Sequence, residues 1–204
     1  MKLYIANKNS SSWSLRPWLA MQVKGIEFEE VMVPFEMDTA NAHFGKFSPN
    51  GKVPCLVDGD ITVWESLAIL EYLADKFPDK NLWPQDPAQR AVARAISSEM
   101  LGGFAALRAQ CSMNFARAIS KLPVSAQTMK DVNRIEQIWD QYLQKSGGPF
   151  LFGEFTNADA MYAPVVNRLE IYQLSNTPAV RQYSKSIKSI PSWQAWEKAG
   201  KAEP

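Results

Sequence analysis

The hydrophobic pattern of this chain changes once, near residue 80, and this change constrains its fold more than any other feature. Up to residue 79, short β-type runs alternate with helical runs, whereas after residue 87 every long apolar run has helical spacing. Residues 80–87 include two prolines and have no periodicity, which is typical of a linker. We therefore expect an α/β domain at 1–79, a linker at 80–87 and an all-helical domain at 88–204.

The first part contains the elements of a small mixed sheet. These are a strand, a helix, three strands and a helix, expected at residues 2–6, 13–24, 28–33, 53–57, 61–64 and 66–77. Asp58-Gly59-Asp60 separates the last two strands and is the strongest hairpin signal in the chain. An order of βαβ followed by ββα is the thioredoxin-like arrangement.

The second part has the pattern of a helical bundle. Helical faces cover residues 88–117, 126–145, 157–172, 179–187 and 192–198. Thr156 and Asp159 stand three residues apart before an apolar run, so we interpret them as a capping box that starts a core helix, not as a catalytic pair.

Composition and motifs exclude several classes of protein. Lys and Arg total 22 against 21 Asp and Glu, and they are scattered, so we expect no nucleic-acid or membrane partner. The single histidine, His43, lies in a polar loop-like stretch, and neither phosphate-binding glycine motifs nor zinc spacings occur, so we expect no metal. Cys55 and Cys111 form no CxxC pair, and no signal segment is present, which together predict a cytoplasmic protein.

Candidate chemistry begins with the serine-rich segment before the first helix. Residues 10–16 read SSSWSLR, and serine hydroxyls beside the orphan N–H groups of a helix start favour a bound anion. Taken alone, the segment is more typical of a helix capped by one serine than of a catalytic site.

Two further segments suit a peptide ligand. In GKVPCL, at residues 51–56, the proline follows a turn at a strand start, which predicts a cis Val53–Pro54 bond; a trans proline at a sheet edge is the alternative. A cis bond would free the Val53 main chain to pair with an extended peptide. At the start of the next helix, Glu65 suits an ammonium and Ser66 a carboxylate.

Together these segments resemble the cytosolic glutathione transferases of the serine type, most closely the zeta class. SSWSLR is similar to the zeta signature SSCSWR, and SPNGKVPCL, WESLAILEYLADKFP and TNADAMYAP fall at that family's cis-proline turn, Glu/Gln-Ser turn and capping box. The resemblance implies a thioredoxin-like glutathione-binding domain followed by a helical-bundle domain. It also implies glutathione as cosubstrate, a small electrophile as second substrate, and a homodimer.

The resemblance also implies roles for individual residues. Ser11 falls at the catalytic serine of the zeta signature, and Ser12 is the alternative, since other serine-type classes place the hydroxyl one residue nearer the arginine. Val53 would hold the cysteinyl main chain of glutathione beside a cis Pro54. Glu65 and Ser66 would bind the γ-glutamyl group, and Lys52 would bind the glycyl carboxylate. Trp13 would lie beside the sulfur.

Two departures from the zeta pattern bear on the second substrate. Trp13 replaces the signature cysteine with an apolar ring, and Ile171 and Tyr172 stand where the zeta isomerases carry an arginine, with Arg168 one helical turn earlier. A dicarboxylate requires a well-placed arginine, so we expect transfer of glutathione to a hydrophobic electrophile.

Three alternatives remain open at this point. The chain could be an isomerase of the maleylacetoacetate type, a glutathione- or ligand-binding protein with little turnover, or a thiol oxidoreductase using Cys55. The last is disfavoured because Cys55 follows the proline on a strand instead of opening a helix. For the second substrate, we expect a wall formed by one long helix, with contacts from Met100, Phe104, Arg108 and Met113.

Overall fold

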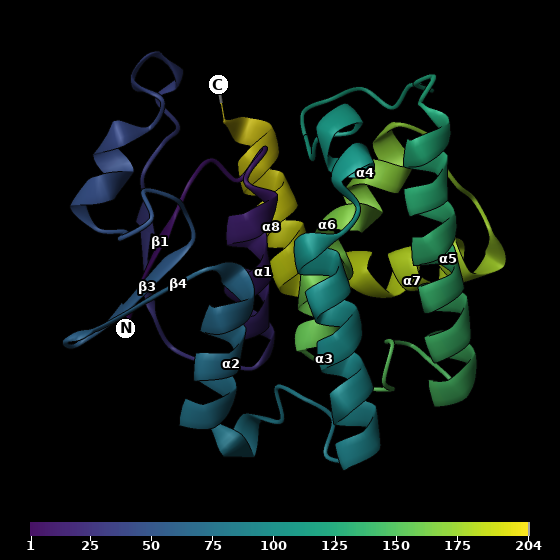
Figure 1. Cartoon of the computed structure of the whole chain (residues 1–204), viewed down its shortest axis with the longest axis horizontal. Helices are drawn as coiled ribbons and strands as arrows, with labels where there is room; N and C mark the ends of the chain where they lie inside the picture. Colours follow the sequence, from purple (N-terminus) through teal and green to yellow (C-terminus); the bar gives the residue numbers. More distant parts are fainter. Residues whose placement is uncertain (204) are drawn as a thin grey trace.

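The computed structural model describes residues 1–203, apart from the side chain of Met37, and has a sheet-containing part beside a helical part (Figure 1). The first part follows the expected order. Its strands are β1 (Lys2–Ile5), β2 (Glu29–Met32), β3 (Cys55–Asp58) and β4 (Ile61–Trp64). Its helices are α1 (Ser12–Val23) and α2 (Ser66–Lys76), with short 3-10 turns η1 (Met37–Thr39), η2 (Ala42–Lys46) and η3 (Pro78–Lys80).

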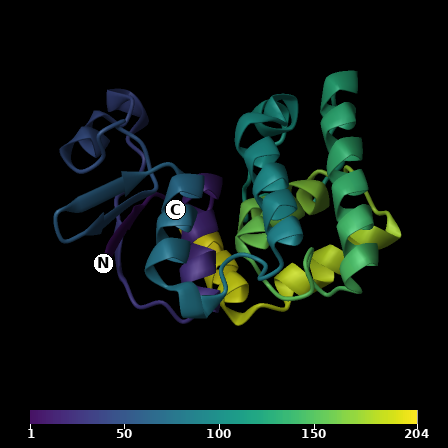
Figure 2. The same ribbon diagram turned by 60° about the horizontal axis from the view of Figure 1, so that its bottom comes forward.

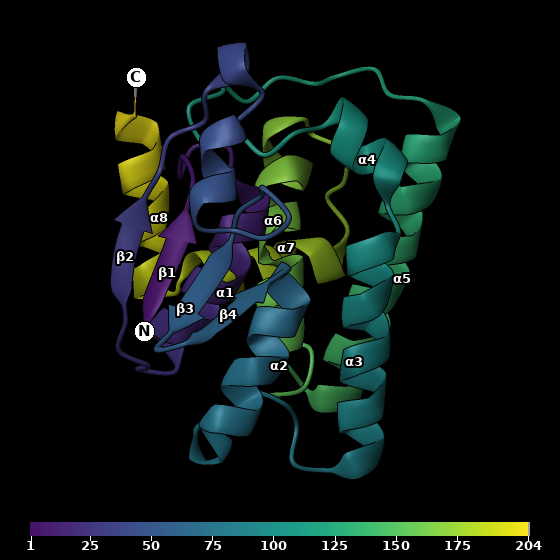
Figure 3. The same cartoon turned by 60° about the vertical axis from the view of Figure 1, so that its left-hand side comes forward.

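The four strands form one mixed sheet in the order β2-β1-β3-β4, which Figure 3 shows face-on. β1 and β2 are parallel, with Leu3 opposite Glu30, because α1 forms the crossover between them. β3 runs antiparallel to both β1 and β4, and Gly59 adopts a positive φ of 59° in the tight turn of the β3–β4 hairpin. The thioredoxin-like prediction for this part is therefore confirmed.

The second part is helical, as expected, and lies on one side of the sheet domain (Figure 2). Its helices are α3 (Pro87–Gly102), α4 (Ala105–Gln110), α5 (Ala126–Ser146), α6 (Asn157–Ile171), α7 (Pro178–Lys188) and α8 (Pro191–Ala202). The prediction of a single helix over 88–117 was wrong, because the helix is interrupted after Gly102 and the chain is irregular beyond Gln110. At the break, Phe104 adopts a φ of 56°, and a Cβ on Gly103 would lie 2.6 Å from the Glu99 carbonyl oxygen.

One hydrophobic core runs through both parts. It includes Leu15 and Leu19 of α1, Met161 of α6 and Trp196 of α8, all fully buried. The residues between η3 and α3 also pack into it: Leu82 and Trp83 are both 5% exposed or less. The α1 helix consequently lies between the sheet and the helical bundle, and groups from both parts reach its first turn.

The start of α6 is fixed by a buried carboxylate, as the Thr156–Asp159 pattern predicts. Asp159 accepts hydrogen bonds from the backbone N–H groups of Thr156 at 2.8 Å and Leu151 at 3.1 Å. The hydroxyls of Thr156 and Tyr183 also donate to it, at 3.1 Å and 3.0 Å. Burial raises the pKa of Asp159 to about 6, although all four donors oppose that shift. This residue therefore has a structural role.

Two features of the described residues bear on function. None of the helices in residues 1–203 is long and apolar enough to cross a membrane. Over the same range, no group of three or more His, Cys, Asp or Glu side chains could hold a metal ion. His43 is half-buried in η2, where Nε2 lies 3.0 Å from the Pro34 carbonyl oxygen, so it ties one loop segment to another.

Candidate functional site

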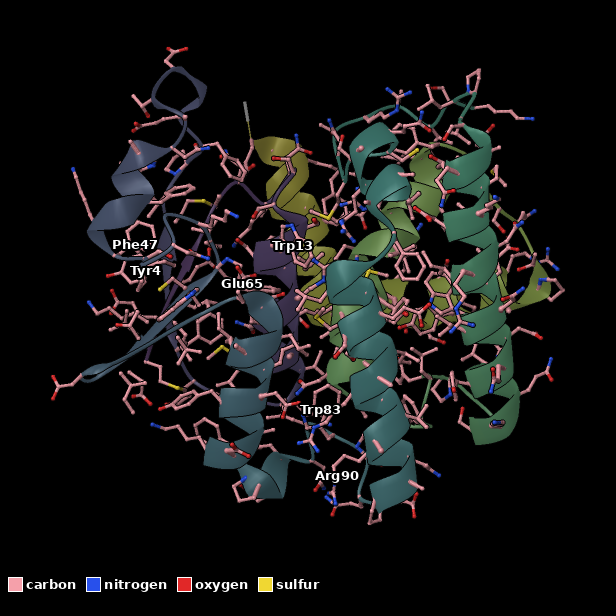
Figure 4. The ribbon with its side chains drawn as sticks, in the orientation of Figure 1. Tyr4, Trp13, Phe47, Glu65, Trp83 and Arg90 are labelled. Atoms are coloured by element: carbon pink, nitrogen blue, oxygen red, sulfur yellow. The ribbon has the colours of Figure 1, made fainter. Side chains whose placement is uncertain are left out.

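A cavity of about 400 Å³ brings together residues that are distant in the sequence. Five of the predicted site residues line it, and two further residues, Asn50 and Leu101, complete the wall; the five are Trp13, Lys52, Val53, Pro54 and Glu65. Figure 4 shows Trp13 and Glu65 near the first turns of α1 and α2, facing the space between the two parts. The cavity therefore lies where two helix N-termini meet the edge of the sheet.

The proline turn presents free main-chain groups at the cavity wall. The Val53–Pro54 peptide bond is cis, which confirms the expectation from GKVPCL. Within the described residues, the N–H and C=O groups of Val53 form no hydrogen bond to another part of the chain. A ligand with an extended peptide backbone can therefore pair with Val53 as an added strand does.

Glu65 is held in position by a residue that the sequence interpretation treated only as part of a turn. The Asn50 side-chain amide donates to Glu65 Oε1 at 3.0 Å. The Asn50 side-chain oxygen, Oδ1, in turn accepts from the Lys52 backbone N–H at 3.0 Å and from the Ser48 hydroxyl at 2.9 Å. Glu65 adopts a φ of 70°, in the left-handed region, and directs its carboxylate to the cavity mouth. One Glu65 oxygen stays free for a cationic group.

Ser66 lies behind this wall and does not line the cavity. It is 1% exposed, and its hydroxyl points toward the Met161 sulfur at 3.9 Å, a weak acceptor. Its position as the first residue of α2 leaves its backbone N–H without a helical partner. The helix start can therefore bind a carboxylate through main-chain groups, with the hydroxyl available after a rotamer change.

The two candidate serines differ in their hydrogen bonds. Ser11 is the N-cap of α1, and its hydroxyl donates to Ser14 Oγ at 2.7 Å. Ser12 instead accepts a hydrogen bond from the Arg168 guanidinium at 3.0 Å. Both serines are 5% exposed, and Trp13, the next residue, lines the cavity. The serines therefore lie immediately behind the wall that Trp13 forms.

Three arginines surround this helix start, and the sequence interpretation gave only Arg108 a role in the site. The guanidinium carbons of Arg16 and Arg108 lie 3.9 Å and 5.5 Å from the centre of the Trp13 ring. Arg16 donates to the Met161 carbonyl at 3.0 Å, and Arg168 to the Cys111 carbonyl. Among the described residues, none of the three has a carboxylate within 4.0 Å.

The electrostatic result is a region of positive charge beside α1. Burial lowers the pKa of Arg168 to about 10, with the neighbouring charge of Arg108 acting in the same direction. Burial also lowers the pKa of Arg16, while Arg168 and Arg108 add to that effect. All three guanidinium groups stay charged at neutral pH, so an anion at the first turn of α1 is favoured.

The expected wall for a second substrate is only partly present. Met100, Phe104 and Met113 belong to the core and are at most 7% exposed, and Leu101 lines the cavity instead. Met100 and Leu101 are neighbours on α3 and point in different directions, whereas Phe104 and Met113 lie beyond the break after Gly102. Arg108 lies close to Trp13, as its assignment to that wall requires.

The Cys55 thiol is unsuited to redox chemistry. It is fully buried at the start of β3, 3.4 Å from the Phe47 carbonyl oxygen, and burial raises its pKa. A thiol in this environment stays protonated and unreactive at neutral pH.

The fold and the cavity together define a class of protein: a thioredoxin-like domain joined to a helical bundle, with a site for a peptide-like anion between them. Comparison with known proteins specifies the family. The glutathione S-transferase N-terminal domain matches residues 10–76. Maleylacetoacetate isomerase of Rattus norvegicus is 31% identical over 199 residues, which cover 94% of this chain and 89% of the relative.

A second relative and a solved structure agree with this match. Glutathione S-transferase Z2 of Arabidopsis thaliana is 29% identical over 204 residues, covering 95% of this chain and 89% of the relative. A glutathione transferase homologue from Burkholderia, solved with bound glutathione, has a TM-score of 0.75 at 23% identity and covers 99% of this chain and 98% of its own. The chain belongs to the glutathione S-transferase family, and it is a glutathione-dependent enzyme.

Proposed function

We propose that this protein ionises the thiol of bound glutathione and directs it at a hydrophobic electrophile. The observation that carries this proposal is the convergence of the helix starts of α1 and α2 with the Val53–Pro54 turn on one cavity. In the reaction, the thiol loses its proton to solvent, the sulfur electron pair forms the new S–C bond, and the leaving group departs with the electrons of the bond it loses.

The cavity suggests a single orientation for glutathione. The ammonium of the γ-glutamyl residue binds the free oxygen of Glu65, and the α-carboxylate of the same γ-glutamyl residue binds the first turn of α2 at Ser66. The cysteinyl main chain pairs with Val53 beside Pro54, and the glycyl carboxylate lies within reach of Lys52. The thiol then falls at the first turn of α1, near Trp13.

The required stabilisation of the thiolate is modest. A thiol with a pKa near 8.5 needs about 2.7 kcal/mol of preferential thiolate binding to shift by about two units. A hydroxyl hydrogen bond and the positive end of a helix each contribute about 1 kcal/mol or more in a partly buried site. The three arginines beside α1 act in the same direction.

We propose Ser11 as the hydroxyl that binds the thiolate, with Ser12 as the alternative. Ser11 is the N-cap of α1 and forms no capping bond with its own helix, so its hydroxyl can rotate from Ser14 to the sulfur. Ser12 is engaged by Arg168, which occupies one lone pair but leaves its proton available. The two variants Ser11→Ala and Ser12→Ala separate these roles.

The test measures the ultraviolet absorbance of bound thiolate as a function of pH. Loss of the correct hydroxyl should raise the pKa of the bound thiol by about one to two units, with the glutathione Kd nearly unchanged. Ser10→Ala is the matched control, because Ser10 is exposed and directly precedes Ser11. If neither Ser11→Ala nor Ser12→Ala moves the titration, the serine-type mechanism is wrong for this protein.

One observation favours a second candidate, a glutathione-dependent isomerase acting on a carboxylate-bearing substrate. Arg108 lies beside Trp13, without a carboxylate partner among the described residues, although Ile171 and Tyr172 stand where the zeta isomerases carry an arginine. Turnover of a neutral aromatic halide tests the transferase, and turnover of a cis-dicarboxylate tests the isomerase. Arg108→Met should abolish only the second activity, while a protein that binds glutathione and turns over neither supports the low-turnover alternative.

We further propose a cytoplasmic homodimer. Exposed apolar side chains on the edge strand β4 support the dimer: Ile61 is 50% and Trp64 is 41% exposed. Sedimentation at micromolar concentration should show a species of twice 22.9 kDa. A single species at the monomer mass would contradict the dimer, and cell fractionation tests the location.

A further inference from the structure

The loop that precedes the candidate serines is held by the far end of the chain. This loop, residues 7–10, connects β1 to the N-cap of α1, and Asn7 closes its turn by accepting from the Ser11 N–H at 2.8 Å. Figure 1 shows the end of α8 beside this loop. Three groups on or just after α8 contact it.

The strongest of these contacts is a carboxylate that accepts from two consecutive backbone N–H groups. Glu203 Oε1 lies 2.6 Å from the Lys8 nitrogen, and Glu203 Oε2 lies 3.0 Å from the Asn9 nitrogen. Hydrogen bonds to an ionised acceptor are about twice as strong as those between neutral groups. The bidentate geometry also restricts rotation of the loop, because both peptide units are held at once.

Two α8 residues complete the attachment. Trp196 donates its indole N–H to the Lys8 carbonyl at 2.8 Å. Gly200 lets the helix approach the loop closely, since a Cβ there would lie 2.9 Å from the Asn9 nitrogen. The Lys8 side chain lies 5.2 Å and 5.4 Å from the Trp18 and Trp196 rings and pairs with Glu30 at 2.6 Å.

The carbonyl groups of the same loop are bound from the other side by the segment after α4. The Phe115 N–H donates to the Asn9 carbonyl at 3.2 Å, and the Ala116 N–H donates to the Asn9 side-chain oxygen at 3.0 Å. Asn9 therefore has groups of the helical part on both sides. Because Ser11 is two residues further along and begins α1, movement of this loop changes the position of its hydroxyl.

We propose that Glu203 is a positioning residue of the thiolate site, acting through the loop 7–10 on the hydroxyl of Ser11. This inference rests on the proposed function, because it assumes that a hydroxyl at this helix start binds the sulfur. Glu203 does not touch glutathione. It keeps the α1 N-cap in register with the cavity, so its loss affects ionisation of the thiol and not the affinity for the tripeptide.

The test uses Glu203→Ala and Glu203→Gln in the full chain, with Glu197→Ala as the matched control. Glu197 lies on α8 and accepts from Trp193 and Lys201, and among the described residues its carboxylate forms no hydrogen bond with the loop 7–10. We expect Glu203→Ala to raise the pKa of bound glutathione thiol by about 0.5 to 1 unit, with the Kd changed less than about twofold. Glu203→Gln keeps one acceptor oxygen, so we expect it to raise the thiol pKa by about half as much as Glu203→Ala. It also serves as the test if Glu203→Ala does not fold.

Two outcomes overturn the inference. One is a lower melting temperature of the Glu203 variants with an unchanged thiol titration, which leaves Glu203 a purely structural role. The other is additivity. If Glu203 acts through the serine hydroxyl, Glu203→Gln should add no further shift to the serine variant that itself shifts the titration, so an additive shift in the double variant overturns the inference. If the serine variants shift the titration and Glu203→Ala does not, only this inference fails. If neither serine variant shifts it, the proposed function fails first.

Discussion

The two ends of the glutathione cavity are stabilised in different ways. At the γ-glutamyl end, Asn50 links Lys52 to Glu65 through contacts that span at most 15 residues. At the thiol end, the serine loop and Ser12 are held by Glu203 and Arg168, which are more than 150 residues away in the sequence. The end that we propose to bind the γ-glutamyl group is built locally, whereas the end that we propose to ionise the sulfur depends on the helical part.

This difference indicates that affinity and reactivity can be changed separately. A local turn can keep its geometry when distant packing changes, since its hydrogen bonds form within one segment. The first turn of α1 has no such independence, because its surroundings come from α6, α8 and the segment after α4. We therefore expect variants of the helical part to change the thiol pKa first, and variants of the local turn to change Kd first.

The largest effect should follow from the buried carboxylate that begins α6, the helix that carries Arg168 and Met161. In Asp159→Asn, the new amide N–H₂ faces backbone donors that the carboxylate accepted. We expect the free energy of unfolding at pH 7, where the carboxyl is ionised, to fall by about 2 to 4 kcal/mol. Urea denaturation measures it, with the exposed Asp140→Asn of α5 as control, and an equal loss in both would remove the special role of Asp159.

The same residue predicts a pH dependence of stability. Because burial raises its pKa from 3.8 to about 6, the folded state holds a proton there that the unfolded chain has released. Its contribution to stability is full below the unfolded pKa and is lost as the pH rises through about 6. Relative to Asp159→Asn, the wild type should lose about 2 to 3 kcal/mol between pH 4 and pH 6.5. A constant difference across that range would show that the carboxyl stays ionised.

The next effect concerns the locally built end. Glu65→Ala removes the charge that binds the γ-glutamyl ammonium, and we expect the glutathione Kd to rise about 10- to 100-fold, or about 1.4 to 2.7 kcal/mol. The pKa of the bound thiol should stay within about 0.3 unit of the wild-type value. Calorimetric titration gives the first quantity and thiolate absorbance at saturating glutathione the second. A large shift of the thiol pKa would show that affinity and thiol ionisation are not separately controlled by the two ends.

The smallest effect should come from Asn50, which orients Glu65 without binding the ligand. Asn50→Ala should raise the Kd about 3- to 10-fold, because the Glu65 carboxylate loses one neutral hydrogen bond and some of its orientation. In the Glu65→Ala background the same substitution should add little, since its partner is already gone. Additive effects in the double variant would mean that Asn50 contacts glutathione directly.

Much of this molecule was predictable from local patterns. The order of strands and helices, the Asp58-Gly59-Asp60 hairpin, the capping carboxylate Asp159 and the cis Val53–Pro54 bond all depend on residues close together in the sequence. The break of the helix at Gly103 was missed because Met100, Phe104 and Met113 kept a helical spacing across it. Two successive glycines were the available signal, since glycine is the weakest helix former after proline.

The sequence by itself determined the fold class and the segments that carry the site, because turn chemistry and hydrophobic periodicity act over a few residues. Only the tertiary structure decided what surrounds the candidate serines: Arg168 on Ser12, the arginines beside Trp13, and Glu203 on the preceding loop. None of these side chains has a distinctive local pattern, since an arginine or glutamate on a helix usually faces water. Their roles arise from the shared core, which packs α6 and α8 against α1 and so excludes water from the helix start where we propose that the thiolate binds.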